Sequence, residues 1–176
     1  FTVRVGSVMT TYRDFDAPDA FTTTAVGRPG ERTFLIQVRG EGETITVKCE
    51  KSQVAAIAHY VRELLADLPD SKDAPLPEAL SVSPNPEVAF VVGPIGVAYD
   101  RELDRIVIHL DEMVDLDEEG EPLDDVVASR IRGFLTRAQA LAFCDHADDV
   151  VGAGRPNCRW CGLPMNIDGH PCPRMN

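Results

Sequence analysis

Residues 32–68 read RTFLIQVRGEGETITVKCEKSQVAAIAHYVRELLADL, and the spacing of their apolar residues changes partway along. Apolar and polar residues alternate over 32–39 and 44–50, on either side of a Gly-Glu-Gly turn, which predicts a hairpin of two strands. Over residues 53–68 the apolar residues recur every three or four positions, as on one face of a helix, and Pro69 ends this pattern. The segment therefore predicts strand, turn, strand and helix.

Further strands are expected before and after this segment, together with a second helix. Strands are predicted at 2–8, 21–27, 88–92, 95–100, 105–110 and 129–135, and a second helix at 137–151. Aligning Gln53 with Gln139 superposes the two helices and the strands before them, which indicates an internal repeat. The sequence thus predicts an α+β domain of two pseudo-repeated β-β-β-α units, about residues 1–68 and 87–152, with a mainly antiparallel sheet.

Other segments complete the expected organisation. Residues 69–86 are rich in proline and predict a linker that runs over the surface. Residues 111–125 hold nine acidic residues and no basic one, which predicts a solvated loop because the charges repel one another. The ligand spacing and turn glycine of a calcium-binding EF-hand loop are missing from it. We expect residues 1–152 to form the body and 153–176 to form a zinc-binding tail.

Composition excludes several classes of protein. No window approaches the roughly 20 apolar residues that span a bilayer. The formal charge of −12 would repel a phosphate backbone, which argues against binding to DNA, RNA or anionic lipid by the whole surface. The chain starts with Phe-Thr-Val-Arg-Val, which favours a trimmed start over a signal peptide. Five cysteines, three of them clustered with a histidine, suit a reducing compartment, so a cytoplasmic location is expected.

The tail carries the most specific motif of the chain. Cys158 and Cys161 form a C-x2-C turn, and His170 and Cys172 follow after a second turn. Gly162 permits the left-handed backbone that such a turn requires. Four protein ligands leave no position for water, so the motif predicts one structural Zn²⁺ rather than a catalytic one. The alternative is that the three cysteines are ordinary buried thiols.

The remaining cysteines and histidines have simpler interpretations. Cys49 and Cys144 fall among apolar residues of a predicted strand and helix, which favours small core residues over nucleophiles. His59 and His146 have charged neighbours and are expected on the solvated surface. No phosphate-binding loop, dinucleotide fingerprint, nucleophile elbow or H-E-x-x-H motif is present.

Gln37 and His109 are the candidates for a site on the sheet. Aligning Phe34 with Ile106 places Gln37 on His109, and each faces away from the apolar residues of its strand. Corresponding spots on one face of the sheet could therefore carry a functional polar pair. Plain exposure of both side chains is the alternative.

Four stretches resemble a known family: AVGRPGERTF (25–34), KSQV (51–54), GRPNCRWCGLP (154–164) and GHPCPR (169–174). The family is an uncharacterised, largely actinobacterial one, domain of unknown function 3090, and the likeness runs over nearly the whole chain. The resemblance implies a cytoplasmic protein and no specific activity. Members are often encoded beside a predicted phosphomutase-like protein and a distant kinase-like protein, which hints at a shared pathway.

Three functions are compatible with these patterns. A non-catalytic interaction or adaptor module is favoured, because the one specific site is structural and no catalytic set of residues appears together. Its docking residues would be Trp160 and Arg159, with the indole packing on a partner protein or on its own chain. An enzyme acting on a small polar or phosphorylated substrate at Gln37 and His109 is the alternative. The third hypothesis is RNA or ribosome contact through the tail.

Overall fold

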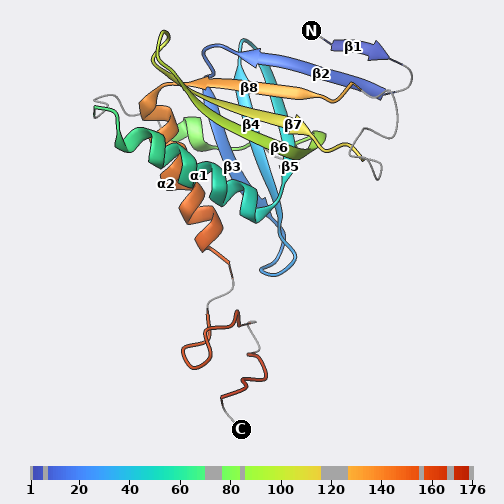
Figure 1. The fold of residues 1–176 in the computed structure, drawn as a ribbon. Helices are drawn as coiled ribbons and strands as arrows, with labels where there is room; N and C mark the ends of the chain where they lie inside the picture. Colours follow the sequence, from blue (N-terminus) through green and yellow to red (C-terminus); the bar gives the residue numbers. More distant parts are fainter. Residues whose placement is uncertain are drawn as a thin grey trace.

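Among the residues that the structure describes, five strands precede the first α-helix and three more precede the second, in the arrangement that Figure 1 shows for this computed structural model. The described residues are 2–5, 8–69, 77–83, 86–115, 127–154, 157–165 and 169–174. The strands are β1 (Thr2–Val5), β2 (Val8–Phe15), β3 (Ala20–Val26), β4 (Thr33–Gly40), β5 (Glu43–Cys49), β6 (Val88–Asp100), β7 (Arg105–Glu112) and β8 (Arg130–Leu135). The helices are α1 (Lys51–Ala66), α2 (Arg137–Gly152) and a short 3₁₀ helix, η1 (Pro77–Leu80).

The strands form one sheet in the order β1-β2-β8-β7-β6-β5-β4-β3. Neighbouring strands pair antiparallel except β2 with β8 and β5 with β6, which are parallel. In Figure 1, β3, β4 and β5 run steeply across β2, β8, β7 and β6, so the sheet is strongly curled. The prediction of an α+β fold with a mainly antiparallel sheet is confirmed.

Two predictions about the strands are wrong. No strand was expected over most of Val8–Phe15, yet β2 forms there and pairs with β8. Only Thr10 and Phe15 of its described side chains are buried, so the apolar alternation that marks a strand is weak. Conversely, the predicted strands 88–92 and 95–100 are one strand, β6, with an irregular register between Val92 and Ile95. A proline there interrupts the ladder without ending the strand.

The predicted linker and acidic loop are described only in part. Within the linker 69–86, η1 forms, while residues 70–76 and 84–85 lie outside the described residues. Of the acidic stretch 111–125, the first two residues end β7, and residues 116–125 lie outside the described residues. Within the described part of the chain, no helix is long and apolar enough to cross a membrane.

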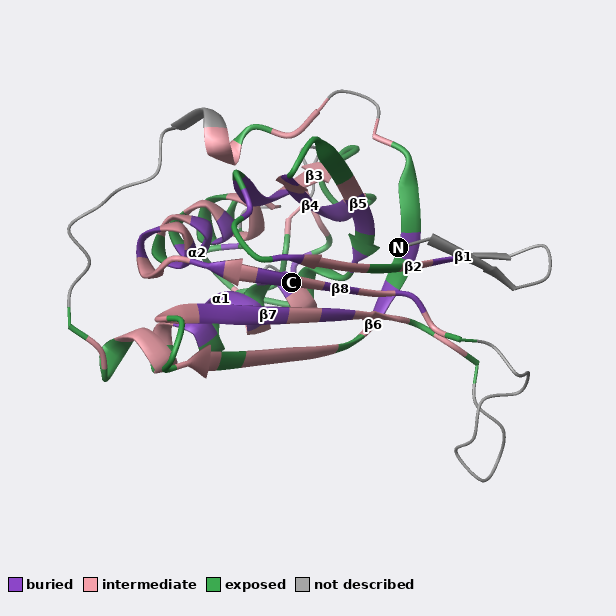
Figure 2. Ribbon diagram, turned by 90° about the horizontal axis from the view of Figure 1, so that it is seen from above, coloured by how far each residue is buried: buried purple, intermediate pink, exposed green. Residues whose placement is uncertain are grey.

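The core lies between the curled sheet and the two α-helices. The helices pack against each other, α2 along β3 and α1 along β6 (Figure 1). Buried segments of the strands and helices face one another in Figure 2. The largest fully buried apolar side chains are those of Phe15, Phe143, Ile36, Ile57, Ile106, Ile108, Leu110, Ile131 and Leu135. These residues come from both ends of the chain, so the body has one shared core.

The two hairpins that precede the helices have the same register. Phe34 of β4 pairs with Cys49 of β5, one residue before the N-cap of α1. Ile106 of β7 pairs with Leu135 of β8, again one residue before the N-cap of α2. Each helix then begins with a capping box completed by a glutamine at its third position. The two segments therefore share one hairpin geometry and one way of starting a helix.

The capping glutamines also bind the sheet in the same way. The Nε2 of Gln53 donates to the carbonyl oxygens of Val92 and Gly93 in β6, at 3.2 and 2.9 Å. The Nε2 of Gln139 donates to the carbonyl oxygen of Pro18, just before β3, at 2.8 Å. Each helix start is thus tied to a strand that lies far away in the sequence.

Candidate metal centre

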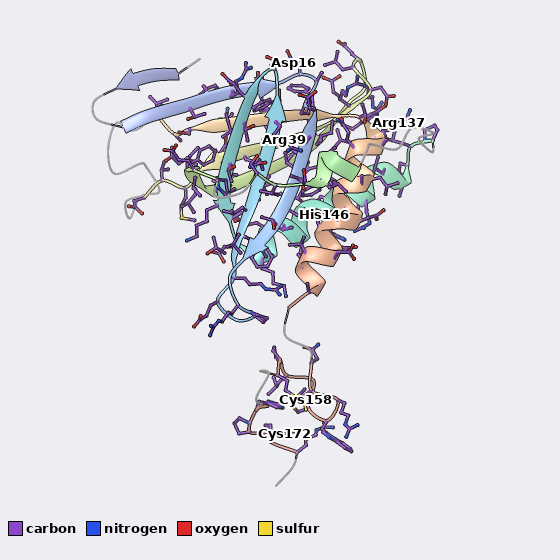
Figure 3. The ribbon with its side chains drawn as sticks, turned by 180° about the vertical axis from the view of Figure 1, so that it is seen from behind. Asp16, Arg39, Arg137, His146, Cys158 and Cys172 are labelled. Atoms are coloured by element: carbon purple, nitrogen blue, oxygen red, sulfur yellow. The ribbon has the colours of Figure 1, made fainter. Side chains whose placement is uncertain are left out.

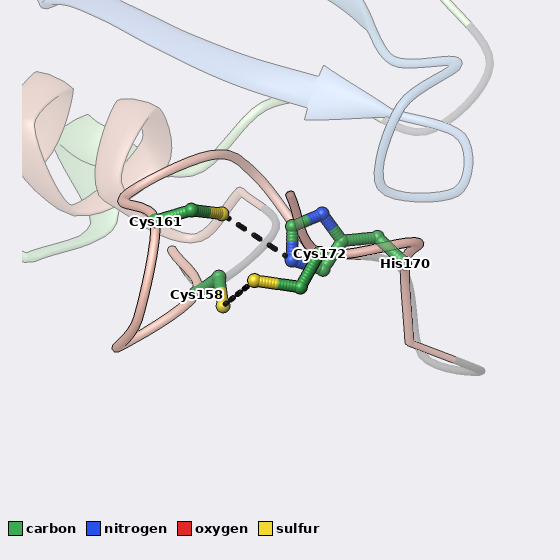
Figure 4. A group of neighbouring side chains, drawn as sticks. All are labelled: Cys158, Cys161, His170 and Cys172. Atoms are coloured by element: carbon green, nitrogen blue, oxygen red, sulfur yellow. Dashed lines mark hydrogen bonds between the residues drawn. The ribbon is translucent and has the colours of Figure 1, made fainter. Parts of the chain in front are cut away.

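Four side chains of the tail meet at one point. Cys158, Cys161, His170 and Cys172 each offer one ligand atom, and these atoms all lie within 4.8 Å of one another. The sulfur atoms of Cys158 and Cys172 are 3.9 Å apart, and the Cys161 sulfur lies 3.5 Å from His170 Nε2 (Figure 4). The spacing in the sequence predicted these four residues as ligands, and the structure brings all four together.

A tight turn positions the first two sulfur atoms. The N–H of Gly162 donates to the carbonyl oxygen of Cys158 at 2.8 Å, and the N–H of Cys158 donates to that of Leu163 at 2.8 Å. Gly162 has φ +74°, the left-handed conformation that glycine adopts without steric cost. The N–H of Trp160 points at the Cys158 sulfur, 3.5 Å away. The backbone therefore supports a thiolate at Cys158 besides shaping the turn.

The surroundings of Cys158 favour its charged form. Hydrogen bonds, first from the backbone of Cys161 and then from His170 and the backbone of Trp160, lower the pKa of Cys158 to about 6. Metals bind the thiolate, so this environment prepares Cys158 as a ligand at neutral pH. Three sulfur atoms and one imidazole nitrogen are enough ligands to fill a tetrahedral metal site without a position for water. The cluster could hold a metal ion in a structural role.

Trp160 lies at the tip of the turn and is open to solvent. Its side chain is 55% exposed. The guanidinium carbon of Arg159 lies 5.0 Å from the centre of its ring, a cation–π contact between the two predicted docking residues. The tail stands below the body in Figure 3, where Cys158 and Cys172 mark it. A cavity of about 240 Å³ lies between tail and body, lined by Gly30, Arg32, Phe34, Lys51, Gly154, Asn157 and Pro164 and not by Trp160.

Gln37 does not line an open face of the sheet. Its side chain is fully buried, with Nε2 donating to the hydroxyl of Thr46 at 2.9 Å and Oε1 accepting from the N–H of Ser83 at 3.0 Å. The expected exposure of Gln37 is therefore wrong, because the chain that leads from η1 to β6 covers this part of β4. Gln37 serves as a bridge between β4 and that segment.

His109 lies on a more open part of the sheet, among charged residues that its own sequence neighbourhood does not reveal. The guanidinium of Arg132 pairs with Asp14, and that of Arg130 pairs with Asp111. Burial, then the charges of Arg132 and Arg130, lower the pKa of His109. Arg130 and Arg132 alternate along β8, and this alternation was the signal in the sequence for a charged face of the sheet. It could not show which aspartates pair with them, because these come from strands β2 and β7.

The other cysteines and histidines are mostly as predicted. Cys49 and Cys144 are buried, and burial raises the pKa of each thiol to about 12. His59 is exposed near Glu63, 3.6 Å away. His146 is not a solvated residue, because its Nε2 lies 2.9 Å from the carbonyl oxygen of Thr23 on the edge strand β3. The helix packing that brings α2 onto β3 causes this contact, and the helical pattern alone does not show it.

One comparison with known proteins gives a match. The model of a family described as "Protein of unknown function (DUF3090)" matches residues 13–172, nearly all of the body and the four clustered tail residues. No curated protein and no solved structure matches the chain.

Proposed function

The chain belongs to the DUF3090 family, and we propose that it is a non-catalytic interaction module whose tail is made rigid by one structural Zn²⁺. The proposal joins a body with its own core to a small metal-dependent docking surface. The observation that carries it is the exposed indole of Trp160, which sits on a turn whose two flanking cysteines belong to the cluster that could hold a metal ion.

Zinc is the proposed metal because of the ligand set. Three thiolates and one imidazole form one of the usual closed zinc sites, and softer or borderline metals prefer such ligands over carboxylate oxygens. All five cysteines are free thiols, which suits a reducing compartment, and we propose that the protein works in the cytoplasm.

Metal analysis tests the zinc site. Protein purified without chelator should contain one zinc per chain, and Cys161→Ser should release it while the circular dichroism of the body stays the same. The variant removes one of four ligands and touches none of the core. Cys49→Ser is the control, because that cysteine is buried away from the cluster and its variant should keep the zinc. Zinc-free wild-type protein would contradict the proposal.

The exposure of Trp160 favours docking over packing on its own body. Burying an indole contributes roughly 2–3 kcal/mol, and a rigid support lowers the entropic cost of using it as an anchor. The tail residues that reach the cavity beside the body are Gly154, Asn157 and Pro164, on a different part of the tail. Trp160 and Arg159 are therefore available to a partner protein.

Trp160→Ala tests this role. Docking predicts an unchanged melting temperature and loss of a partner that co-purifies with the wild-type protein. Packing on the body predicts a lower melting temperature of the isolated chain. Leu163→Ala is the matched control, since Leu163 is a 50% exposed apolar residue of the same tail. If neither stability nor any interaction changes with Trp160→Ala, the tail is not the docking surface.

We also propose that the two β-β-β-α units arose as a structural duplication. The support comes from the shared hairpin register, the two capping boxes and the matching contacts of Gln53 and Gln139. In this scheme the strands β2 and β3, which a short bend separates, correspond together to the single long strand β6. Each of these elements begins in a parallel pair and ends in an antiparallel one.

A binding site for a small anionic ligand around His109 is the second candidate function. Arg130 and Arg132 flank His109 on the sheet and would attract a phosphorylated substrate, although each already pairs with an aspartate. Titration with inorganic phosphate, followed by NMR of the His109 ring, tests it. A saturable shift that Arg132→Gln abolishes would favour the enzyme alternative. No shift at millimolar phosphate would dismiss it.

A further inference from the structure

A groove runs between α1 and the second half of β6. It has a volume of about 480 Å³. Ile57, Tyr60 and Leu64 line it from the helix, and Ile95 and Val97 line it from the strand. Glu63 is the charged residue of its lining. The groove is therefore an apolar channel with one acidic residue at its side, and none of its lining residues belongs to the tail.

One wall of the groove is a strand with an open edge. Residues 95–100 of β6 pair with β7 on one side, whereas β5 pairs with β6 only at Val88 and Val91. Among the described residues, no strand pairs with the second edge of residues 95–99, and β6 lies at the rim of the body in Figure 2. In an antiparallel ladder every second residue points its N–H and C=O away from its partner. This edge thus presents unpaired backbone donors and acceptors along the groove.

Within residues 95–99 themselves, the usual protection of an edge strand is missing. Proteins cover edge strands or place charges and prolines on them to prevent pairing with other chains. Residues 95–99 read IGVAY and include no charge and no proline. Ile95 and Val97 turn toward the groove, so an added strand would meet apolar side chains and free backbone groups together.

The corresponding place beside α2 is closed. Phe143 of α2 packs on Phe21 of β3 with ring centres 5.0 Å apart, and His146 bonds the carbonyl oxygen of Thr23. Tyr60 stands as far beyond Gln53 in α1 as His146 stands beyond Gln139 in α2. Tyr60 nevertheless points into solvent and is 55% exposed. One carbonyl oxygen of the β3 edge is thus bonded from within the chain, whereas among the described residues no strand pairs with the edge at residues 95–99 of β6.

We propose that the groove binds an extended peptide segment of another protein, which pairs with residues 95–99 as an added strand. Alternate side chains of the peptide enter the groove between Tyr60 and Val97, and a lysine or arginine of the peptide meets Glu63. Charge selects this occupant over a second copy of the chain. A second copy would bring another Glu63 to the same place and a formal charge of −12. This docking surface is independent of the metal tail.

The test begins with a displayed library of random nine-residue peptides, selected on the intact chain. Enriched peptides should carry apolar residues at alternate positions and at least one basic residue. A synthetic peptide of the enriched sequence is then titrated against Ala56→Glu and Ala55→Glu. Ala56 lines the groove, whereas Ala55 is an exposed neighbour on the same helix that does not line it. We expect binding to weaken about tenfold or more with Ala56→Glu and to stay within about twofold with Ala55→Glu.

Two N-methylated forms of the same peptide test the backbone pairing. Methyl groups on one alternate set of amides should abolish binding, and methyl groups on the other set should leave it intact, because only one set faces β6. Tyr60→Ala, a change at an exposed side chain, replaces Ala56→Glu if that variant fails to fold.

Three results with peptides would overturn the proposal. In the first, the selection enriches no peptide. In the second, both methylated forms bind with equal affinity. In the third, the selected peptide binds the Ala56→Glu or Tyr60→Ala variant as tightly as the wild-type chain. Sedimentation showing a dimer that Ala56→Glu dissociates would also overturn it, by naming a second copy as the occupant. None of these results bears on the zinc content or on Trp160.

Discussion

Cys49 and Cys144 differ from the tail cysteines in their surroundings rather than in their chemistry. Burial raises the pKa of both thiols to about 12, whereas hydrogen bonds lower that of Cys158 to about 6. Since only the thiolate reacts with disulfide reagents or binds metal, Cys49 and Cys144 are inert in the core, whereas Cys158 is ready for a metal.

Thiol labelling checks this difference. At pH 8 a thiol of pKa about 12 is ionised in roughly one molecule in ten thousand, so Cys49 and Cys144 should stay unlabelled in the folded protein. Both should react within minutes in guanidinium chloride. Peptide mapping by mass spectrometry after timed alkylation measures the rates. Labelling of either residue in the folded chain as fast as in the unfolded chain would contradict the buried placement.

The two α-helices are fixed to the sheet by their capping glutamines. Thr136 donates its N–H to Gln139 Oε1 at 2.9 Å, while Gln139 Nε2 donates to the carbonyl oxygen of Pro18 at 2.8 Å. One side chain therefore closes the helix start and holds a distant strand. Gln53 has the same double role at α1.

Substitution of these glutamines should cost both contacts. Gln139→Ala is expected to lower the free energy of unfolding by about 1–3 kcal/mol, because the N–H of Thr136 loses the side-chain half of the capping box and the carbonyl oxygen of Pro18 is left without its partner. Gln53→Ala should have a similar effect. Gln139→Glu keeps an acceptor for the cap but loses the donor to Pro18, so it should fall between wild type and alanine. Urea unfolding followed by circular dichroism measures all three, and no loss of stability with either alanine variant would contradict this role.

The whole molecule divides into a body with a core and a tail without one. The buried apolar residues of the body form one cluster from Phe15 to Ala147, and among the described residues of the tail the buried side chains are Cys158 and Cys172 of the candidate metal cluster. A chain that ends at Gly152 should therefore keep the melting temperature of the full chain to within about 2 °C. Differential scanning calorimetry measures it. A fall of about 10 °C or more would mean that the tail stabilises the body.

Local patterns in the sequence determined the elements and the ligand set. The change of apolar spacing near residue 50 predicted a hairpin and α1, and α2 followed from the same pattern. The C-x2-C turn with Gly162, His170 and Cys172 predicted a cluster that the structure brings together. These features depend on residues close in the chain, where hydrogen-bond geometry and side-chain periodicity act directly.

Tertiary structure decided what no local pattern contains. It paired β2 with β8 and β5 with β6 in parallel, and it buried Gln37 beneath the chain that leads into β6. It also brought His146 onto the carbonyl oxygen of Thr23 in β3, and among the described residues it placed no strand beside residues 95–99 of β6. Each outcome depends on which distant segments meet, because a polar side chain stays in solvent or is buried according to what packs over it. The four clustered residues of the tail were therefore predictable from their spacing alone, whereas the groove beside β6 exists only in the folded chain.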